Sequence, residues 1–386
     1  MIAARKEKIV VIADDFTGAA EIGGIGLRRG LKVLIETSVS GNTDVDLLVI
    51  ATDTRSMNQE EASDVITKLT GQLLDLQPKF IFKKTDSVLR GNILSELLAQ
   101  QQVIGSKRII LVPANPHFGR IITNGIYFID GKPLAETSFA NDPQYPAKSS
   151  DVKEILKLSG QEIHCFNAND ILPAEGIIVG NVKNVADLNA WGNYFDKNTV
   201  FAGGSGFFDA LLQKHFPAPS VQFPKTNVKN KMALFVYGST FHKNGDSYLP
   251  ENTIYLRPEL FSDTLSVSLF SETTTEIIGS IKKENHVSLS TKNLDSELYS
   301  PELIRERTSI LVSNLMKQTS IDELYIEGGA TTYSILTKLG VSQLIPVREI
   351  EFGVIEMKSL AFPEMRLFTK PGSYSWPKQI LKEKTK

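Results

Sequence analysis

The feature that most constrains the fold is a short apolar run that stops abruptly at polar residues and gives way to a helix pattern. Ile9–Ala13 is such a run, and Asp14 and Asp15 follow it at once. Similar runs predict strands at 32–36, 47–51, 80–82 and 108–112, and apolar residues at helical spacing predict helices at 17–29, about 62–73 and 93–102. Fully apolar strands that alternate with helices predict a parallel sheet with helices on both faces.

The same alternation restarts in the second half of the chain. Residues 217–231 hold three prolines and few periodic apolar residues, which predicts a linker. Strands are predicted at 232–237 and 323–327, helices at 301–316 and 331–339, and a hairpin excursion in the turn-rich stretch 125–146. We therefore predict an α/β protein with domains at 1–216 and 232–386, each a mainly parallel sheet flanked by helices, with an active-site cleft between them.

Composition excludes several classes of protein. The 386 residues include 42 Lys and Arg against 44 Asp and Glu, a net charge of −2 that argues against a nucleic-acid binder. The single cysteine, Cys165, excludes an intrachain disulfide framework and a multi-thiolate metal site, and we predict no metal-ligating residues. No stretch approaches the roughly 18 apolar residues of a membrane span, so we expect a cytoplasmic protein with no membrane partner.

Two clusters of polar residues follow predicted strands, where parallel sheets place their ligand sites. Asp14 and Asp15 could bind substrate hydroxyls or accept a proton, although one aspartate could simply cap the next helix. The stretch 83–91 gathers cations, a carboxylate and hydroxyls, as a phosphate or sugar-acid site requires; a solvated charged turn is the alternative. Its candidate residues are Lys83, Lys84, Thr85, Asp86, Ser87 and Arg90.

Two further segments are weaker candidates. Residues 113–120 form a rigid loop that could direct Asn115, His117 or Arg120 at a ligand, or be purely structural. In the second domain, Gly328 and Gly329 before a helix predict an anion-binding turn, and 237–240 and 369–373 are similar in character. Together these three turns favour a nucleotide-phosphate site. A fourth glycine turn, 203–206, is better explained as a structural turn.

Common nucleotide signatures are missing from the sequence. There is no GxxxxGK[ST] loop, and residues 24–29 break the GxGxxG fingerprint at its last position. An oxidoreductase is therefore disfavoured.

Taken in order, these segments resemble the four-carbon acid sugar kinase family. The resemblance rests on ADDFTGAAEIG at 13–23, KKTDSVLRGN at 83–92, PANPHFGR at 113–120, the segments 124–125, 130–137 and 142–143, GGATT at 328–332, residues 349–354 and TKPGS at 369–373. It implies ATP-dependent phosphorylation, with Mg²⁺, of threonate, erythronate or an oxo-tetronate. It also implies that the N-terminal domain binds the acid and the C-terminal domain binds ATP. A homodimer is left open.

The resemblance also implies roles for individual residues. Arg55 and Lys84 would hold the substrate carboxylate, and Asp15 or Asp14 would orient the terminal hydroxyl and accept its proton, with Asp86 as the rival. Lys83, Thr85, Ser87, Arg90, Asn115 and Arg120 complete the expected acid site, and Ser239, Gly328, Gly329, Ala330, Thr331, Lys370 and Gly372 the expected ATP site. This chain has Ala330 where the family usually has an aspartate. A sugar-acid or nucleotide-binding protein with an altered ATP site is therefore the alternative to an active kinase.

Overall fold

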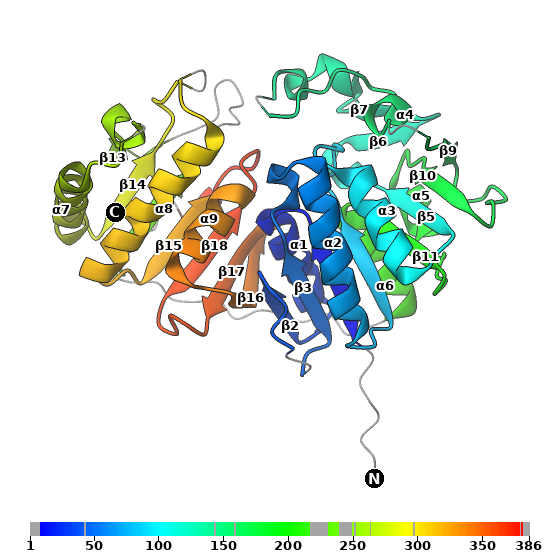
Figure 1. Ribbon diagram of the computed structural model, residues 1–386, viewed down its shortest axis with the longest axis horizontal. Coiled ribbons are helices and arrows are strands. Elements are labelled where there is room, and N and C mark those ends of the chain that lie inside the picture. The colour runs from blue at the N-terminus through cyan, green and yellow to red at the C-terminus, as the bar shows by residue number, and fades with distance from the viewer. Residues whose placement is uncertain are drawn as a thin grey trace, which may run out of the picture. The chain divides into compact units, whose positions relative to one another are not determined.

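The computed structural model describes residues 8–41, 44–142, 144–157, 160–216, 231–238, 249–250, 252–262, 264–295, 298–378 and 380 (Figure 1). The chain divides into two compact units, Met1–Val221 (unit 1) and Gln222–Lys386 (unit 2). The predicted linker lies outside the described residues except for Lys231, and so does Ser239. The predicted domain boundaries and the cleft between the domains stay predictions.

Unit 1 is built on a parallel sheet. Its order is β2 (Val33–Glu36), β3 (Leu47–Ala51), β1 (Ile9–Ala13), β4 (Phe80–Lys84), β11 (Thr199–Gly203), β5 (Arg108–Val112), β10 (Gly176–Gly180) and β9 (Ile163–Phe166). Every neighbouring pair runs parallel. The predicted parallel sheet is confirmed.

Helices cover both faces of the unit 1 sheet. Figure 1 shows α2 (Gln59–Leu74) and α3 (Ile93–Ile104) side by side on one face. On the other face, α1 (Phe16–Arg28) packs against α6 (Ser205–His215), which is flanked by α5 (Val185–Trp191). In α2 the buried residues Ala62, Ile66, Leu69 and Leu73 recur at helical spacing, and each large aliphatic side chain contributes about 1.5–3 kcal/mol by burial.

A hairpin excursion follows β5, as predicted. Its strands are β6 (Arg120–Thr123), β7 (Ile126–Ile129) and β8 (Lys132–Pro133), and α4 (Val152–Ile155) comes after it. Each turn has two residues with positive φ, at Asn124-Gly125 and Asp130-Gly131, which are the residue types that tight hairpin turns require. The excursion lies beyond the edge of the sheet where β4 ends (Figure 1).

Unit 2 has a mainly parallel sheet, also as predicted. Its order is β13 (Thr253–Tyr255), β14 (His286–Ser290), β12 (Ala233–Tyr237), β15 (Glu323–Glu327), β18 (Arg366–Lys370), β17 (Val354–Ser359) and β16 (Gln343–Glu351). The first five strands are parallel, and β17 is antiparallel to both of its neighbours. The helices are α7 (Val267–Glu284), α8 (Pro301–Gln318) and α9 (Gly329–Leu339).

Stacked aromatic rings fix the register of the central strands of unit 2. Phe235 of β12, Tyr325 of β15 and Phe368 of β18 are register partners, and neighbouring ring centroids are 4.3 Å apart. Such pairs contribute about 0.5–1.5 kcal/mol beyond the burial of their area. Because the three strands are parallel, their carboxyl ends lie at one edge.

One boundary differs from the prediction in a way that affects the site. β4 does not end at Phe82 but continues through Lys84, so the expectation that both lysines lie in the following loop is wrong. Successive strand residues point to opposite faces, which separates the two lysines. Glu96 of α3 neutralises Lys83 in the interior, so a lysine can be buried near the end of this strand.

No helix in the described part of the chain is both long enough and apolar enough to cross a membrane.

Candidate functional site

The first candidate site lies where three adjacent strands of unit 1 end. Asp14 and Asp15 follow β1, Arg55 lies in a 3₁₀ turn, η1 (Thr54–Ser56), after β3, and Asp86 follows β4. Because the sheet order is β3, β1, β4, the fold brings these four residues together from three separate segments.

Arg55 holds the three aspartates of this edge. Its Nε and Nη2 donate to Asp14 Oδ2 at 2.9 and 2.8 Å, its Nη1 donates to Asp15 Oδ2 at 3.1 Å, and Nη1 lies 3.5 Å from Asp86 Oδ1. Burial alone would lower the pKa of Arg55, but the three carboxylates raise it well above its ordinary value. Arg55 is therefore permanently charged and offsets like charges that would otherwise repel one another.

Asp15 has two tasks at this edge. Its Oδ1 caps α1 by accepting from the backbone N–H of Gly18 at 2.8 Å, and its Oδ2 accepts from Thr17 Oγ1 at 2.7 Å. Burial opposes ionisation, yet Arg55, Lys84 and these hydrogen bonds prevail and lower its pKa. The Asp15 side chain is 10% exposed, against 4% for Asp14 and 7% for Asp86. Of the three aspartates, Asp15 is thus the most accessible to a ligand.

Asp86 is enclosed by the loop that follows it. It accepts from Nε and Nη2 of Arg90 at 3.0 and 2.8 Å and from the backbone N–H groups of Val88 and Arg90. Burial opposes ionisation, but Arg90 and Arg55 lower the pKa of Asp86 far below its ordinary value. Arg90 also donates to Asp142 of the excursion at 2.9 Å. With its acceptor sites filled in this way, Asp86 is a structural anchor of the loop.

Lys84 lies between α1 and its own strand. Its Nζ donates to the Thr85 carbonyl at 2.9 Å and is 3.8 Å from Glu21 Oε2. A Cβ at Gly18 would come within 3.1 Å of this ammonium and 2.7 Å of Asp15 Oδ1, so only glycine leaves room there. Burial raises the pKa of Glu21, although Lys84 and a hydrogen bond from Ser205 of α6 oppose this.

The hairpin excursion contributes a further cation. Arg120 Nη1 donates to Ser87 Oγ, and the Tyr127 hydroxyl donates to the Ser87 carbonyl. Arg120 is half-buried, lies close enough to Glu21 to affect its pKa, and forms no ion pair within the described residues. Tyr145 closes the other side by donating to the Arg55 carbonyl. Arg120 is therefore the cation of this edge best placed to pair with an anionic ligand.

The remaining predicted acid-site residues lie at different depths. Lys83 Nζ is 2.7 Å from Glu96 Oε2 of α3, with side-chain exposures of 1% and 2%. Asn115 pairs through its backbone with Arg120, and His117 is exposed. Buried oxygens of Asp14 (Oδ1), Thr85 (Oγ1) and Asn115 (Oδ1) have no hydrogen-bond partner in the described part of the chain. Unpaired buried acceptors at the ends of strands are unusual and are consistent with a nearby ligand site.

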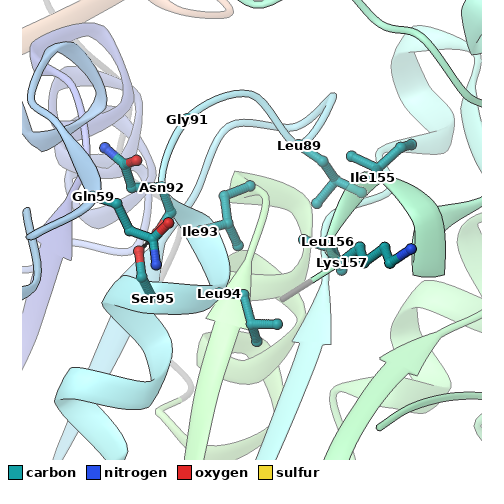
Figure 2. A pocket seen from close by; sticks show the side chains of 10 residues that line it. All are labelled: Gln59, Leu89, Gly91, Asn92, Ile93, Leu94, Ser95, Ile155, Leu156 and Lys157. Carbon is teal, nitrogen blue, oxygen red and sulfur yellow. Dashed lines mark hydrogen bonds between the residues drawn. The ribbon is translucent and has the colours of Figure 1, made fainter. Parts of the chain in front are cut away.

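A small pocket lies between the start of α3 and the end of α4. It has a volume of about 90 Å³, and Figure 2 shows Gln59, Asn92 and Ser95 on one side of it and Ile155, Leu156 and Lys157 on another. That volume suits a few water molecules. None of Arg55, Lys84 and Arg120 lines it, so we do not place a substrate there.

The second candidate site lies at the carboxyl edge of the unit 2 sheet. Tyr237, Glu327 and Lys370 end β12, β15 and β18 and are register partners. Gly328 follows with a φ of 97°, which favours glycine, and caps α9 without a side chain. The first backbone N–H groups of α9 therefore lie at a helix end that carries partial positive charge.

The loop after β12 packs tightly on this helix end. A Cβ at Gly238 would lie 2.6 Å from the side chain of Thr331, whose hydroxyl donates to the Gly238 carbonyl at 3.3 Å. Predicted residues Gly328, Gly329, Ala330 and Thr331 thus form the first turn of α9 and its cap, next to Gly238.

Lys370 is buried and bonded inside unit 2. Its Nζ lies 2.7 Å from Glu327 Oε2 and donates to the carbonyls of Pro371 and Tyr374 at 3.3 and 2.5 Å. Burial lowers the pKa of Lys370, although Glu327 opposes this. Lys370 therefore holds the segment that carries Gly372 against the edge of the sheet.

The sequence analysis did not single out several residues of the first site. Glu21, Glu96, Tyr127 and Tyr145 were not named as candidates, and Asp142 appeared only within a motif. Glu21 could have been found, because an acid five residues after the start of α1 on a buried face is unusual. Tyr145 could not, since its contact with Arg55 spans 90 residues.

The described residues contain no group of three or more His, Cys, Asp or Glu side chains that could hold a metal ion. Glu327, at the end of β15, is already paired with Lys370.

A family model described as a sugar-binding N-terminal domain matches residues 9–211, more than half of the chain. The chain belongs to this family. The predicted resemblance to four-carbon acid sugar kinases is confirmed by this match and by the curated relatives.

Three curated relatives illustrate the likeness. D-threonate kinase of Salmonella typhimurium is 29% identical over 246 residues, which cover 58% of each chain. D-erythronate kinase of Heliobacterium modesticaldum is 32% identical over 256 residues, 60% of this chain and 57% of the relative. 3-oxo-tetronate kinase of Brucella melitensis is 31% identical over 229 residues, 53% and 52% respectively. The matched part of the chain thus spans little more than half the length of these relatives.

Solved structures support the fold. A Salmonella typhimurium protein provisionally named a tRNA synthase is 20% identical with a TM-score of 0.74, and the match covers 95% of this chain and 96% of that one. A Haemophilus influenzae protein of the DUF1537 family is 18% identical with a TM-score of 0.66, covering 95% and 97%. At such identities the likeness concerns the fold alone, and it extends to both units.

Proposed function

We propose that this protein is an ATP-dependent kinase that phosphorylates the terminal hydroxyl of a four-carbon sugar acid such as threonate, erythronate or 3-oxo-tetronate. The observation that carries the proposal is the edge of unit 1, which gathers the cations Lys84 and Arg120 and the ionised carboxylate of Asp15. A small polyhydroxy acid needs both kinds of group, since its carboxylate pairs with cations and its hydroxyls donate to carboxylates. The names of the curated relatives point to the same substrate class.

The substrate carboxylate would pair with Arg120 and Lys84. Arg120 has a guanidinium suited to a carboxylate and forms no ion pair in the described part of the chain, and Lys84 Nζ lies 3.8 Å from Glu21 Oε2 and close enough to Asp15 to lower its pKa. Arg55, which the resemblance assigns to the carboxylate, would instead hold the aspartates that bind the hydroxyls. Its predicted direct contact with substrate stays a prediction.

ATP would bind at the edge of unit 2. The N-terminus of α9 offers backbone N–H groups and partial positive charge to the phosphates, and Gly238 allows a close approach. Lys292, whose Nζ lies 5.7 Å from the centre of the Tyr237 ring, adds a cation after β14. Burial lowers the pKa of Lys292, and an arriving phosphate would favour its charged form.

In the reaction, the terminal hydroxyl oxygen forms a bond to the γ-phosphorus of ATP while the bond to the β–γ bridging oxygen breaks and ADP leaves. The hydroxyl proton passes to Asp15, whose lowered pKa keeps it ionised at neutral pH and ready to orient that hydroxyl. Positioning and charge neutralisation account for most of the catalysis in such transfers. Mg²⁺, bound to the ATP phosphates, would neutralise charge on them.

The test is coupled ADP release with ATP and Mg²⁺ over a panel of threonate, erythronate and 3-oxo-tetronate stereoisomers. We expect one acid to stimulate ADP release. Lys84→Met should lower kcat/KM for that acid by about 10- to 100-fold, the range expected when a charged hydrogen-bond partner is lost. The matched control is Lys32→Met, which removes a lysine whose side chain is 59% exposed and which should leave kcat/KM unchanged.

Other results would change the conclusion. If no acid of the panel stimulates ADP release and ATP does not stabilise the protein in a thermal melt, the kinase proposal is contradicted. If no acid stimulates ADP release but both the acid and ATP bind, the result supports the alternative, a sugar-acid or nucleotide-binding protein in which Ala330 marks an altered ATP site.

A further inference from the structure

A buried ion pair lies beneath the acid site, and the proposed reaction gives it no direct role. Lys83 Nζ of β4 is 2.7 Å from Glu96 Oε2 of α3, with side-chain exposures of 1% and 2%. Burying two charges is costly, and an apolar pair of similar size is often as stable. The arrangement therefore calls for an explanation other than the stability of the core.

The ion pair continues into a chain of hydroxyl groups. Thr54 Oγ1 donates to Glu96 Oε2 at 3.0 Å and lies 2.8 Å from Thr52 Oγ1. Thr52 Oγ1 lies 2.9 Å from the carbonyl oxygen of Ala13, the last residue of β1. The chain thus runs from α3 to the residue before Asp14.

Thr54 is also the first residue of η1, the turn that carries Arg55. The backbone N–H of Arg55 donates to the Asp14 carbonyl at 3.3 Å, and Asn92 Nδ2, at the start of α3, donates to the Thr54 carbonyl at 3.1 Å. Asp53, just before the turn, has a φ of 54°, an unfavourable conformation that contacts of this kind stabilise. The turn is therefore fixed to α3 through Thr54 and to the residue after β1 through the backbone of Arg55.

We propose that the Lys83–Glu96 pair acts through the Thr54 hydroxyl as a positioning device, which holds η1 so that Arg55 keeps Asp14 and Asp15 in place for the sugar acid. The proposal rests on the proposed function. It assigns Lys83, Glu96 and Thr54 to the support of the site, not to contact with substrate.

The strength of the anchor follows from the burial of its parts. Thr54 is fully buried, and its hydroxyl is bonded to a carboxylate that water does not reach. Glu96 keeps the Thr54 hydroxyl oriented whether it is ionised or protonated, because a carboxyl group can accept from or donate to a hydroxyl. Loss of the hydroxyl would leave Glu96 with one partner fewer and the turn free to shift.

The experiment compares two substitutions of one residue. Thr54→Val keeps the shape of the side chain but removes the hydroxyl, whereas Thr54→Ser keeps the hydroxyl. We expect Thr54→Val to raise KM for the sugar acid by about 10-fold or more while KM for ATP changes less than about 2-fold, and Thr54→Ser to restore the KM for the acid.

The matched control is Thr70→Val in α2. Thr70 is also fully buried, but its hydroxyl has no partner in the described part of the chain. It should leave both KM values unchanged, because it removes a buried hydroxyl without touching η1. The KM split and the rescue by serine separate positioning from a general loss of stability.

Three results would overturn the inference. One is a Thr54→Val enzyme with the same acid KM as Thr70→Val, and another is an equal rise in the KM values for acid and ATP. If Thr54→Val does not fold, Thr54→Ala, which also removes the hydroxyl, serves in its place, and an unchanged acid KM in that variant contradicts the proposal. If the wild-type protein releases no ADP with any acid of the panel, the proposed function itself is overturned, and this inference with it.

Discussion

Replacing Arg55 by lysine tests whether one guanidinium holds the acid site together. Arg55 makes three hydrogen bonds to Asp14 and Asp15 and an ion pair with Asp86, and its own side chain is 16% exposed. Lysine keeps the positive charge but has a single ammonium in place of a planar fork. It can bond one of the carboxylates well but cannot bridge all three.

The expected loss of stability follows from these contacts. A hydrogen bond to a charged group contributes about 1.5–3 kcal/mol, and Arg55→Lys loses at least two of them. New contacts of the ammonium offset part of that loss, so we expect the free energy of unfolding of unit 1 to fall by about 3 kcal/mol. The effect is larger than at a surface pair because the carboxylates of Asp14 and Asp15 are only 4% and 10% exposed.

The chain offers a matched control and a local reporter. Arg108 has a nearly equal exposure of 17%, but its partner Asp196 is 41% exposed, so Arg108→Lys should cost only about 1 kcal/mol.

The chain has two tryptophans, Trp191 in unit 1 and Trp376 in unit 2. In a Trp376→Phe background, urea unfolding followed by tryptophan fluorescence therefore reports on unit 1.

The comparison has a clear contrary result. If Arg55→Lys costs no more than Arg108→Lys, the three-carboxylate contact adds nothing to stability. The aspartates would then be held by their other hydrogen bonds, and the account of this edge given above would be wrong.

Three other predictions follow from the two sites. Asp86 has a lowered pKa, so its ionised form stabilises the fold above about pH 4 and that stability is lost progressively as the pH falls; from pH 5 to pH 3 the free energy of unfolding of the wild type should therefore fall by about 1 kcal/mol more than that of Asp86→Asn, as urea unfolding would show. An equal fall in both proteins would contradict this. Gly238→Ala places a methyl group against Thr331 and should raise KM for ATP, measured by ADP release, without changing KM for the acid. Ala330→Asp should alter ATP binding in opposite directions with and without Mg²⁺, as isothermal calorimetry would show.

Much of the fold could be predicted from the sequence because many buried parallel strands are encoded as short, uninterrupted apolar runs. The runs at 9–13, 47–51 and 108–112 coincide with β1, β3 and β5 to the residue. Several strands were not predicted, and β10 and β18 among them are buried and have parallel neighbours. β9 includes a histidine and a cysteine and is only partly buried at the edge of the sheet, and β16 and β17 are antiparallel strands with charged residues.

The extent of β4 shows that charged residues do not always mark the end of a strand. Two lysines in succession suggested that the strand had ended, but Lys83 is neutralised by Glu96, a residue 13 positions later in another element. No local pattern contains that information. The pairing depends on α3 folding back over the sheet, which is a property of the tertiary structure.

The candidate site was predictable as a set of segments but not as a set of contacts. Asp14, Asp15 and Asp86 could be named because they follow strands, and Arg55 was named only through the family resemblance. Their joint contact with one guanidinium depends on the strand order β3, β1, β4, which the sequence does not state.

The aspartate that the family usually has at position 330 offers a test of where ATP binds and of how Mg²⁺ affects its binding. Ala330 lies in the first turn of α9, where a carboxylate would gain about 0.3–1 kcal/mol from the helix dipole, so Ala330→Asp should not destabilise unit 2. If phosphates bind at this helix end, the new carboxylate would repel them in the absence of a metal ion and could share Mg²⁺ with them in its presence. We therefore expect Ala330→Asp to weaken ATP binding in EDTA and to strengthen it with Mg²⁺, while Ala330→Asn, which has the same shape without the charge, changes neither. An unchanged ATP affinity under both conditions would place the nucleotide elsewhere, because a charge introduced beside the phosphates cannot leave their binding untouched.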